Sequence, residues 1–178
     1  ETLTDAVRLA FEKAMPSKVS ASWGHANGLN IAGWDTRHDE EYVTMVLATI
    51  ISGAGATPKQ DGWHAVGPEC CFGALTSGDI ELLEYSYPII IHRYGLMEDS
   101  GGAGEFRGGS GTAWEVEPLD KEMTFIMFGE GRRIPAVGAA GASSAMVEPK
   151  VGRLERKIGG KVEVIKDNII GTIKPGET

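Results

Sequence analysis

Glycine is the residue that most constrains what this sequence can fold into. The chain contains 25 glycines among 178 residues, which is about twice the usual share of about 7%. They follow no three-residue period, so a collagen-like helix is excluded. Excess glycine outside low-complexity sequence indicates left-handed turns or places where backbones pack closely. Turn-rich β structure satisfies both needs better than a helix bundle does.

Length and composition are those of a folded protein. The chain is 42% hydrophobic and 24% charged, so disorder over the whole length is excluded. We expect residues 1–178 to form a single domain. No apolar run approaches the roughly 20 residues that cross a bilayer, so no membrane span is expected. The net charge of −8 disfavours nucleic acid and anionic membranes as partners.

The two cysteines indicate a reducing compartment. Cys70 and Cys71 are neighbours in the sequence, and a disulfide between neighbours closes a strained ring. Together with the lack of a signal-like apolar stretch, this predicts a cytoplasmic protein. Because the first residue is Glu1, the chain reads as trimmed or as a piece of a longer protein.

The apolar periodicity predicts one N-terminal helix followed by antiparallel strands. The helix is expected from Thr4, as its cap, to Pro16, which ends it. The run Tyr42 to Ile51 is β-branched and apolar almost throughout, as in a strand covered on both faces. Further strands are expected at 19–24, 29–34, 112–116 and 123–128, and a small meander at 161–165 and 169–173. The fold class is therefore α+β, predominantly β, and sandwich- or barrel-like.

Two segments leave more than one interpretation open. Residues 80–97 are expected to form a strand pair or one bent strand around Pro88, and a helix capped by Asp79 is the alternative for 79–87. Residues 52–78 and 99–111 are long, glycine-rich and irregular, which in a compact domain is typical of a functional segment. Residues 134–150 are expected to form a surface loop.

Standard catalytic signatures are absent from the sequence. It has no complete dinucleotide fingerprint, P-loop or G-x-S-x-G elbow. It also lacks C-x-x-C and H-E-x-x-H, so no self-contained metal site is predicted.

The segment 99–111, DSGGAGEFRGGSG, is the most distinctive group of residues. Asp99 and Ser100 can set a turn, and the amides of Gly101, Gly102 and Gly104 can form an anion-binding nest. Arg107, followed by Gly108 and Gly109, can reach a carboxylate or a phosphate. The structural alternative is that Arg107 pairs with Asp99 and braces a glycine-rich connection, which is the more common role of such clusters.

A second group lies in the loop 52–78. Asp61 and His64 are candidates for acid–base catalysis or metal binding, and Cys70 or Cys71 for a nucleophile. The alternative is that the cysteines are small buried hydrophobic residues and that His64 is a surface or interface residue. His25 and His92 give weaker signals.

Four motifs give the sequence a family resemblance. They are S-x-S-x-G at residues 20–24, G-A-x-x-x-x-D-G at 55–62, E-x-x-E-Y-x-Y-P at 81–88 and the segment 99–111. Their order resembles the C-terminal third of the hydantoinase B/5-oxoprolinase family, which includes the large subunits of acetone and acetophenone carboxylases. The likeness extends from about Val19 to Gly176.

The resemblance implies a role in an ATP-dependent complex. ATP and Mg would be bound by a hydantoinase A-type partner subunit, which activates a small-molecule substrate by phosphorylation. A divalent metal would lie in the N-terminal part of the B-type subunit, outside this chain. The resemblance implies an oligomer that contains the rest of the B-type subunit. We therefore expect exposed apolar surface where that part docks.

Three functions stay open on the sequence. The first is the opening of cyclic amides in a hydantoinase-type enzyme, with Asp61, His64, Asp99 and Arg107 as catalytic residues. Ser100, Gly101, Gly102, Gly104, Gly108 and Gly109 would then bind the anionic intermediate. The second is the carboxylation of a ketone, and the third is a non-catalytic assembly module. The isolated chain is expected to be inactive.

Overall fold

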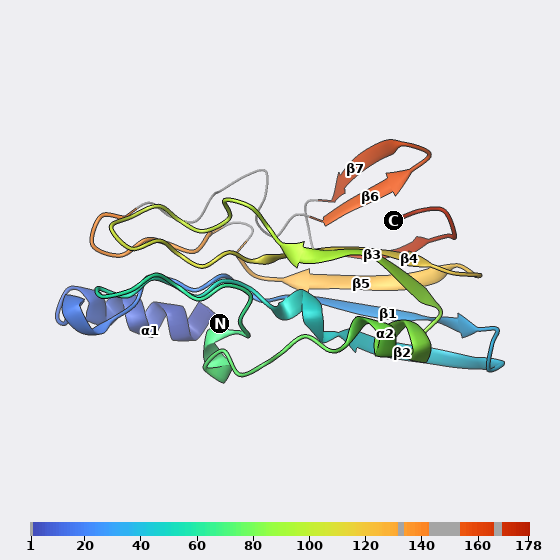
Figure 1. Cartoon of the computed structure of the whole chain (residues 1–178), viewed down its shortest axis with the longest axis horizontal. Coiled ribbons are helices and arrows are strands. Elements are labelled where there is room, and N and C mark those ends of the chain that lie inside the picture. The colour runs from blue at the N-terminus through green and yellow to red at the C-terminus, as the bar shows by residue number, and fades with distance from the viewer. Residues whose placement is uncertain (1, 132–133, 143–153, 166–168) are drawn as a thin grey trace.

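The computed structural model describes residues 2–131, 134–142, 154–165 and 169–178, and it is mostly β (Figure 1). Two helices, α1 (Thr2–Glu12) and α2 (Ile80–Ser86), accompany the strands in the described ranges. The strands are β1 (Asn27–Asp35), β2 (Glu40–Val46), β3 (Ile89–Leu96), β4 (Thr112–Pro118), β5 (Met123–Gly129), β6 (Leu154–Ile158), β7 (Lys161–Ile165) and β8 (Ile169–Ile173). They form no closed barrel.

The largest sheet has four antiparallel strands in the order β2-β1-β5-β8. Strand β1 pairs with β2 through a short polar turn and with β5 on its other side, where Ile31 lies opposite Phe125. Alternation along the strands points Ile31, Phe125 and Met123 to one face, and all three are buried. We call this the inner face of the sheet.

Two hairpins and α2 accompany the sheet. Strands β3 and β4 pair with each other, as do β6 and β7. Buried Ile89 of β3 belongs to the same core cluster as the inner face, and Trp114 and Leu154 pack against that cluster. Helix α2 lies close by, since the ring of Tyr87, just after it, is 5.9 Å from that of Tyr42 (Figure 1). The core therefore lies between the inner face and the hairpins.

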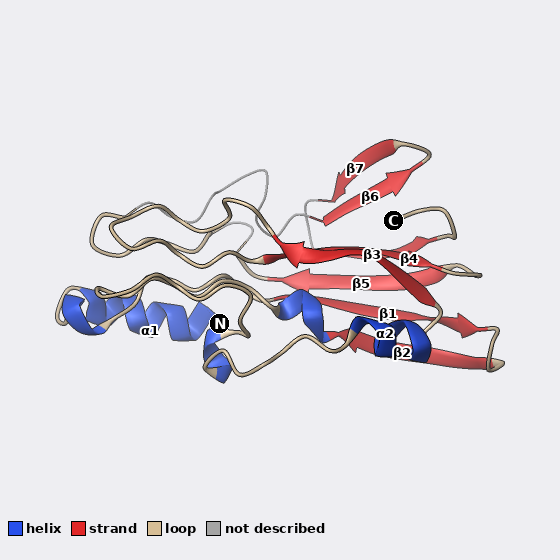
Figure 2. Ribbon diagram, in the orientation of Figure 1, coloured by secondary structure: helices blue, strands red, loops and turns tan. Residues whose placement is uncertain are grey.

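Extended loop segments lie beside α1, beyond one end of the strands (Figure 2). We call residues 21–25, 52–56, 61–66 and 100–111 the glycine bundle. Backbone hydrogen bonds join its segments: Gly24 N donates to Gly53 O, Ala54 N to Trp63 O, and Gly109 N to Ala54 O. Helix α1 is fixed against the bundle by the buried Arg8, which contacts Asp5 and donates to Ser22 Oγ at 2.6 Å.

The glycines of the bundle serve close packing rather than turns. None of them has a positive φ, and in 99–111 it is Asp99 that does, at 53°. A Cβ added to Gly53 or Gly62 would lie 2.0 Å from a backbone oxygen of a neighbouring segment, and one added to Gly101 would lie 2.0 Å from Gly108 O in the returning half of its own segment. The prediction that glycines allow close backbone packing is thus confirmed in the bundle. The prediction that they form left-handed turns is wrong there.

Several sequence predictions of local structure are wrong. Residues 80–86 form a helix and not the strand favoured above, and this confirms the alternative for 79–87, since Asp79 Oδ1 caps the helix by accepting from Leu82 N at 3.1 Å. Strand β2 ends at Val46, where a 3₁₀ turn (Leu47–Ile50) begins. It is an edge strand with Val43 78% exposed, so it is not covered on both faces.

Other errors concern pairing. Residues 19–24 are extended but belong to the glycine bundle, not to a sheet. Strands β4 and β5 flank one turn yet lie in different sheets, and β7 pairs with β6, which the sequence did not predict, while β8 pairs with β5. The predicted helix is present, although it begins at Thr2 and ends at Glu12. The predicted loop 134–150 lies partly outside the described residues. Neither helix is long and apolar enough to be a membrane span within the described part of the chain.

Candidate functional site

Asp61, His64, Asp99 and Arg107 come together in one crevice. Its volume is about 460 Å³, and Glu98 and Ser110 also line it. Arg107 connects its two walls: the Arg107 amide donates to Asp61 Oδ1 at 2.7 Å, and its guanidinium donates to Asp99 Oδ1 at 2.5 Å. The predicted pair of Arg107 with Asp99 is therefore present. The side chain of Arg107 is 52% exposed and that of Asp99 is 72% exposed, so solvent and ligands can reach both.

His64 faces the same crevice with a defined orientation. Its Nδ1 accepts a hydrogen bond from the Ser110 amide at 2.8 Å. Since Nδ1 accepts, the neutral imidazole carries its proton on Nε2. The bond also joins segment 61–66 to segment 100–111. His64 is exposed, as expected for a surface or interface residue, and its Nε2–H is a donor for a group in the crevice.

The charges of the crevice are unequal. Three carboxylates, those of Asp61, Glu98 and Asp99, face one guanidinium, that of Arg107. An anion entering here meets repulsion from the three carboxylates, which disfavours a strongly charged ligand. The crevice is better suited to a neutral group that accepts hydrogen bonds from His64 and Arg107.

The glycines of segment 99–111 also face a second cleft. Ser100, Gly101, Gly102, Gly104, Gly108 and Gly109 line a larger cleft of about 1220 Å³. The Gly108 amide donates to Gly102 O and the Gly109 amide to Ala54 O, so these two donors are used within the bundle. Buried Ser100 donates to Met97 O and accepts from Gly111 N. An anion-binding role of segment 99–111 stays a prediction for the amides of Gly101, Gly102 and Gly104.

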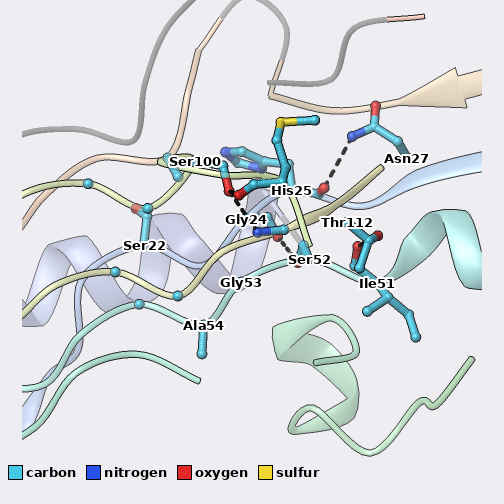
Figure 3. Close-up of a pocket in the computed structure, with 18 of the residues that line it drawn as sticks. Ser22, Gly24, His25, Asn27, Ile51, Ser52, Gly53, Ala54, Ser100 and Thr112 are labelled. Carbon is cyan, nitrogen blue, oxygen red and sulfur yellow. Dashed lines mark hydrogen bonds between the residues drawn. The ribbon is translucent and has the colours of Figure 1, made fainter. Parts of the chain in front are cut away.

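The larger cleft also contains polar residues that are not among the candidates predicted from the sequence. Figure 3 shows Ser22, His25, Asn27, Ser52 and Thr112 around it. Most are used structurally: Ser52 Oγ donates to Gly24 O at 2.8 Å, and Thr112 Oγ1 to Ile51 O at 3.0 Å. The sequence held no signal for them beyond the S-x-S-x-G motif that ends just before His25.

His25 packs at the end of the larger cleft beside an acidic residue. Its side chain is 7% exposed, and Nδ1 is 3.9 Å from Glu130 Oε2. The hydroxyl and amide of Thr2 both donate to that carboxylate and hold the pKa of Glu130 below its usual range. The ring lies against Gly131, where an added Cβ would be 2.6 Å from His25 Cδ2. The bonds from Thr2 to Glu130 thus hold the N-terminus of α1 near the end of β5, and His25 packs beside them.

Cys70 and Cys71 lie apart from the crevice. Both side chains are exposed and neither is in a disulfide, and the two sulfur atoms are 3.8 Å apart. The alternative that they are buried hydrophobic residues is therefore wrong, because the 3₁₀ turn (Glu69–Cys71) lies on the surface. Neither cysteine lines the crevice or the larger cleft.

A metal site needs several ligand side chains close together. Within the described ranges, no three His, Cys, Asp or Glu side chains are grouped so that they could hold an ion. A metal ion therefore does not fit the described part of this chain. The sequence contains no standard phosphate-binding motif.

The comparisons with known proteins agree on the family to which this chain is similar. The family described as Hydantoinase B/oxoprolinase matches residues 1–178. Caprolactamase subunit beta of Pseudomonas jessenii is 64% identical over 179 residues, which cover 99% of this chain. The crystal structure of the ATP-dependent caprolactamase from that organism superposes with a TM-score of 0.83 and 55% identity, over 96% of this chain and 30% of that one.

A more distant relative has a different activity in its name. The acetophenone carboxylase delta subunit of Aromatoleum aromaticum is 32% identical over 105 residues, 58% of this chain and 15% of that subunit. The chain spans only 31% of the caprolactamase subunit. The match over the full chain and the close structural agreement nevertheless define the family. The chain belongs to the hydantoinase B/oxoprolinase family.

Proposed function

We propose that this chain forms part of an ATP-dependent enzyme of the hydantoinase type that opens a cyclic amide. The observation that carries the proposal is the 64% identity, over 99% of the chain, to a subunit of a caprolactamase, whose name denotes action on a cyclic amide. In this proposal a partner subunit of the hydantoinase A type binds ATP and Mg, and the rest of a B-type subunit completes the assembly.

The crevice would act on the amide through donors. Opening the ring adds the oxygen of water to the amide carbon and breaks the C–N bond. The departing nitrogen takes a proton from that water, and the charge that develops on the carbonyl oxygen needs stabilisation. His64 Nε2–H is placed to donate a hydrogen bond to that oxygen, because the Ser110 amide occupies Nδ1. Arg107 would stabilise the oxygen, and Asp61 and Asp99 hold it by its amide and guanidinium. Asp61 and Asp99 thus act as positioning residues.

Carboxylation of a ketone is a second candidate, supported by the match to the acetophenone carboxylase delta subunit. The third is an assembly module without chemistry, supported by the internal pair of Arg107 with Asp99, which alone could explain both residues. The crevice carries donors that either chemistry can use, so substrate tests are needed to distinguish the two reactions.

A chimaeric enzyme would test the proposal. This chain would replace the matching stretch of the P. jessenii caprolactamase subunit beta, and the assembled enzyme would be assayed for ATP-dependent hydrolysis of caprolactam. We expect His64→Ala and Arg107→Ala to lower kcat at least about 100-fold, as removal of a donor that stabilises the developing charge does. Leu82→Ala, at an exposed position of α2, is the control.

Assembly and turnover separate the outcomes. Loss of turnover with an intact complex supports catalysis, and loss of the complex supports the assembly module. Unchanged turnover in both variants would refute the catalytic assignment. Asp99→Asn adds a second measurement: it should raise KM or lower kcat if Asp99 positions Arg107, and should only lower the melting temperature if the pair is a brace. A chimaera that consumes ATP with acetophenone and bicarbonate, but not with caprolactam, would favour the carboxylase.

A further inference from the structure

The four-stranded sheet has a second face that no described element covers. We call it the outer face; its large apolar side chains alternate with those of the core. Val43 is 78% exposed and Ile170 is 70% exposed. The other members are 37–40% exposed: Trp34, Met45, Ile126 and Phe128. Helix α2 and β3 lie on the viewer's side of the sheet in Figure 1, where β3 contributes Ile89 to the core of the inner face.

The strand register brings these side chains into one continuous patch. Met45 lies beside Asn30 in the ladder, Asn30 beside Ile126, and Ile126 beside Ile170, so one row crosses all four strands. The ring of Phe128 lies over Gly28 in the adjacent row, since a Cβ added there would be 2.2 Å from its Cζ. An antiparallel sheet with one solvated face normally carries polar residues on it. This face is instead patterned for burial.

The outer face carries little charge, which indicates a permanent contact. Glu41, beside Trp34, is the charged residue among the outward positions of the four strands. Obligate interfaces resemble a domain core cut in half, whereas interfaces that open and close carry more polar groups. Caprolactamase subunit beta has more than two thirds of its length outside the stretch that this chain matches, so a large polypeptide is available to supply the cover.

We propose that the outer face is the surface on which the remaining two thirds of a hydantoinase B-type subunit packs. Its occupant is an apolar element of that same subunit, rather than the ATP-binding partner or a second copy of this chain. The inference rests on family membership and on the sheet, and it is independent of any catalytic role of the crevice.

Methionine oxidation tests the proposal without measuring activity. Met45 lies on the outer face and is 40% exposed, so hydrogen peroxide should convert it readily to the sulfoxide in the isolated chain. In the chimaera with the P. jessenii subunit, we expect its oxidation to slow at least about tenfold, because oxidation follows exposure. Mass spectrometry of the peptide that contains Met45 gives both rates. Equal rates in the two proteins would overturn the proposal.

A pair of variants provides a second measurement. Val43→Lys changes the outer face, and Val162→Lys changes an exposed valine of β7 that is 52% exposed. Both should leave the melting temperature of the isolated chain nearly unchanged, and only Val43→Lys should lower that of the chimaera. Equal tolerance in the chimaera would contradict the proposal. So would an isolated chain that light scattering shows to be a dimer and that Val43→Lys makes monomeric, because the occupant would then be a second copy.

Discussion

Gly109 is the position where the close packing of the glycine bundle can be tested most directly. It is buried, and its amide donates to Ala54 O at 2.9 Å. A Cβ added there would lie 2.0 Å from Trp63 O and 3.0 Å from Ala54 N. Contacts below 3.0 Å essentially do not occur for a real Cβ, so Gly109→Ala must move one segment by about 1 Å.

The cost follows from the hydrogen bonds that this movement breaks. The bonds at risk are Gly109 N to Ala54 O and Ala54 N to Trp63 O, both 2.9 Å long. Ala54 is 5% exposed, so water cannot replace them. Each bond broken in this buried region costs about 1–3 kcal/mol, so two bonds give about 2–6 kcal/mol. This is a large fraction of a typical stability of about 5–15 kcal/mol.

Urea unfolding of the isolated chain measures the effect, and Gly111→Ala is the matched control in the same segment. The nearest atom to a Cβ at Gly111 is Ser52 Cα at 4.0 Å, so that variant should be neutral or stabilise by up to about 1 kcal/mol. With a slope of about 2 kcal/mol per molar urea, Gly109→Ala should lower the midpoint by about 1–3 M. Equal midpoints for the two variants would refute the close-packing argument.

Three further predictions concern other parts of the chain. Asp79→Ala should destabilise the protein by about 0.5–2 kcal/mol, since Leu82 N loses its cap, and thermal unfolding would show this. The bond from His92 holds the pKa of Glu117 below its usual 4.5. The stabilisation is therefore complete above pH 4.5 and lost as the pH falls below it, and Glu117→Gln should flatten this acid loss in a pH series of melting temperatures. Burial raises the pKa of Tyr42 to about 12. Ultraviolet titration should thus show one late phenol that Tyr42→Phe removes, and stability should fall above pH 10 because the unfolded chain loses this proton first.

The elements that the sequence predicted correctly are those with local causes. The first helix has an apolar stripe, and β1 and β5 alternate with period two, so each carries its own signal. Segment 80–86 was assigned wrongly because its apolar residues suit either state, and the single hydrogen bond from Leu82 N to the Asp79 carboxylate decides for a helix. Strand pairing was missed at β4 and β8, since a turn in the sequence does not say which distant strand completes a ladder.

The sequence pattern does not say which chain covers an apolar strand face. The apolar run at 42–51 suggested a strand covered on both faces, yet Val43 is exposed and the strand ends at Val46. If the outer face packs on the rest of a B-type subunit, the sequence pattern describes the complete subunit correctly. The contacts of the candidate site were also predictable only in part. The pair of Arg107 with Asp99 was foreseen from spacing in one segment, but the bond from Ser110 to His64 joins residues 46 positions apart, and nothing local encodes it.

The stability of the bundle and the geometry of the crevice depend on the same contacts. Trp63, whose carbonyl faces Gly109, immediately precedes His64, and Gly109 immediately precedes Ser110. A Cβ at Gly109 therefore pushes apart the two residues that the bond from Ser110 to His64 joins. If His64 donates to the substrate, Gly109→Ala in the chimaera should lower kcat even at temperatures where circular dichroism shows the enzyme folded. Normal turnover in a folded Gly109→Ala chimaera would mean that His64 needs no positioning by Ser110, and the catalytic assignment of His64 would then lose its structural basis.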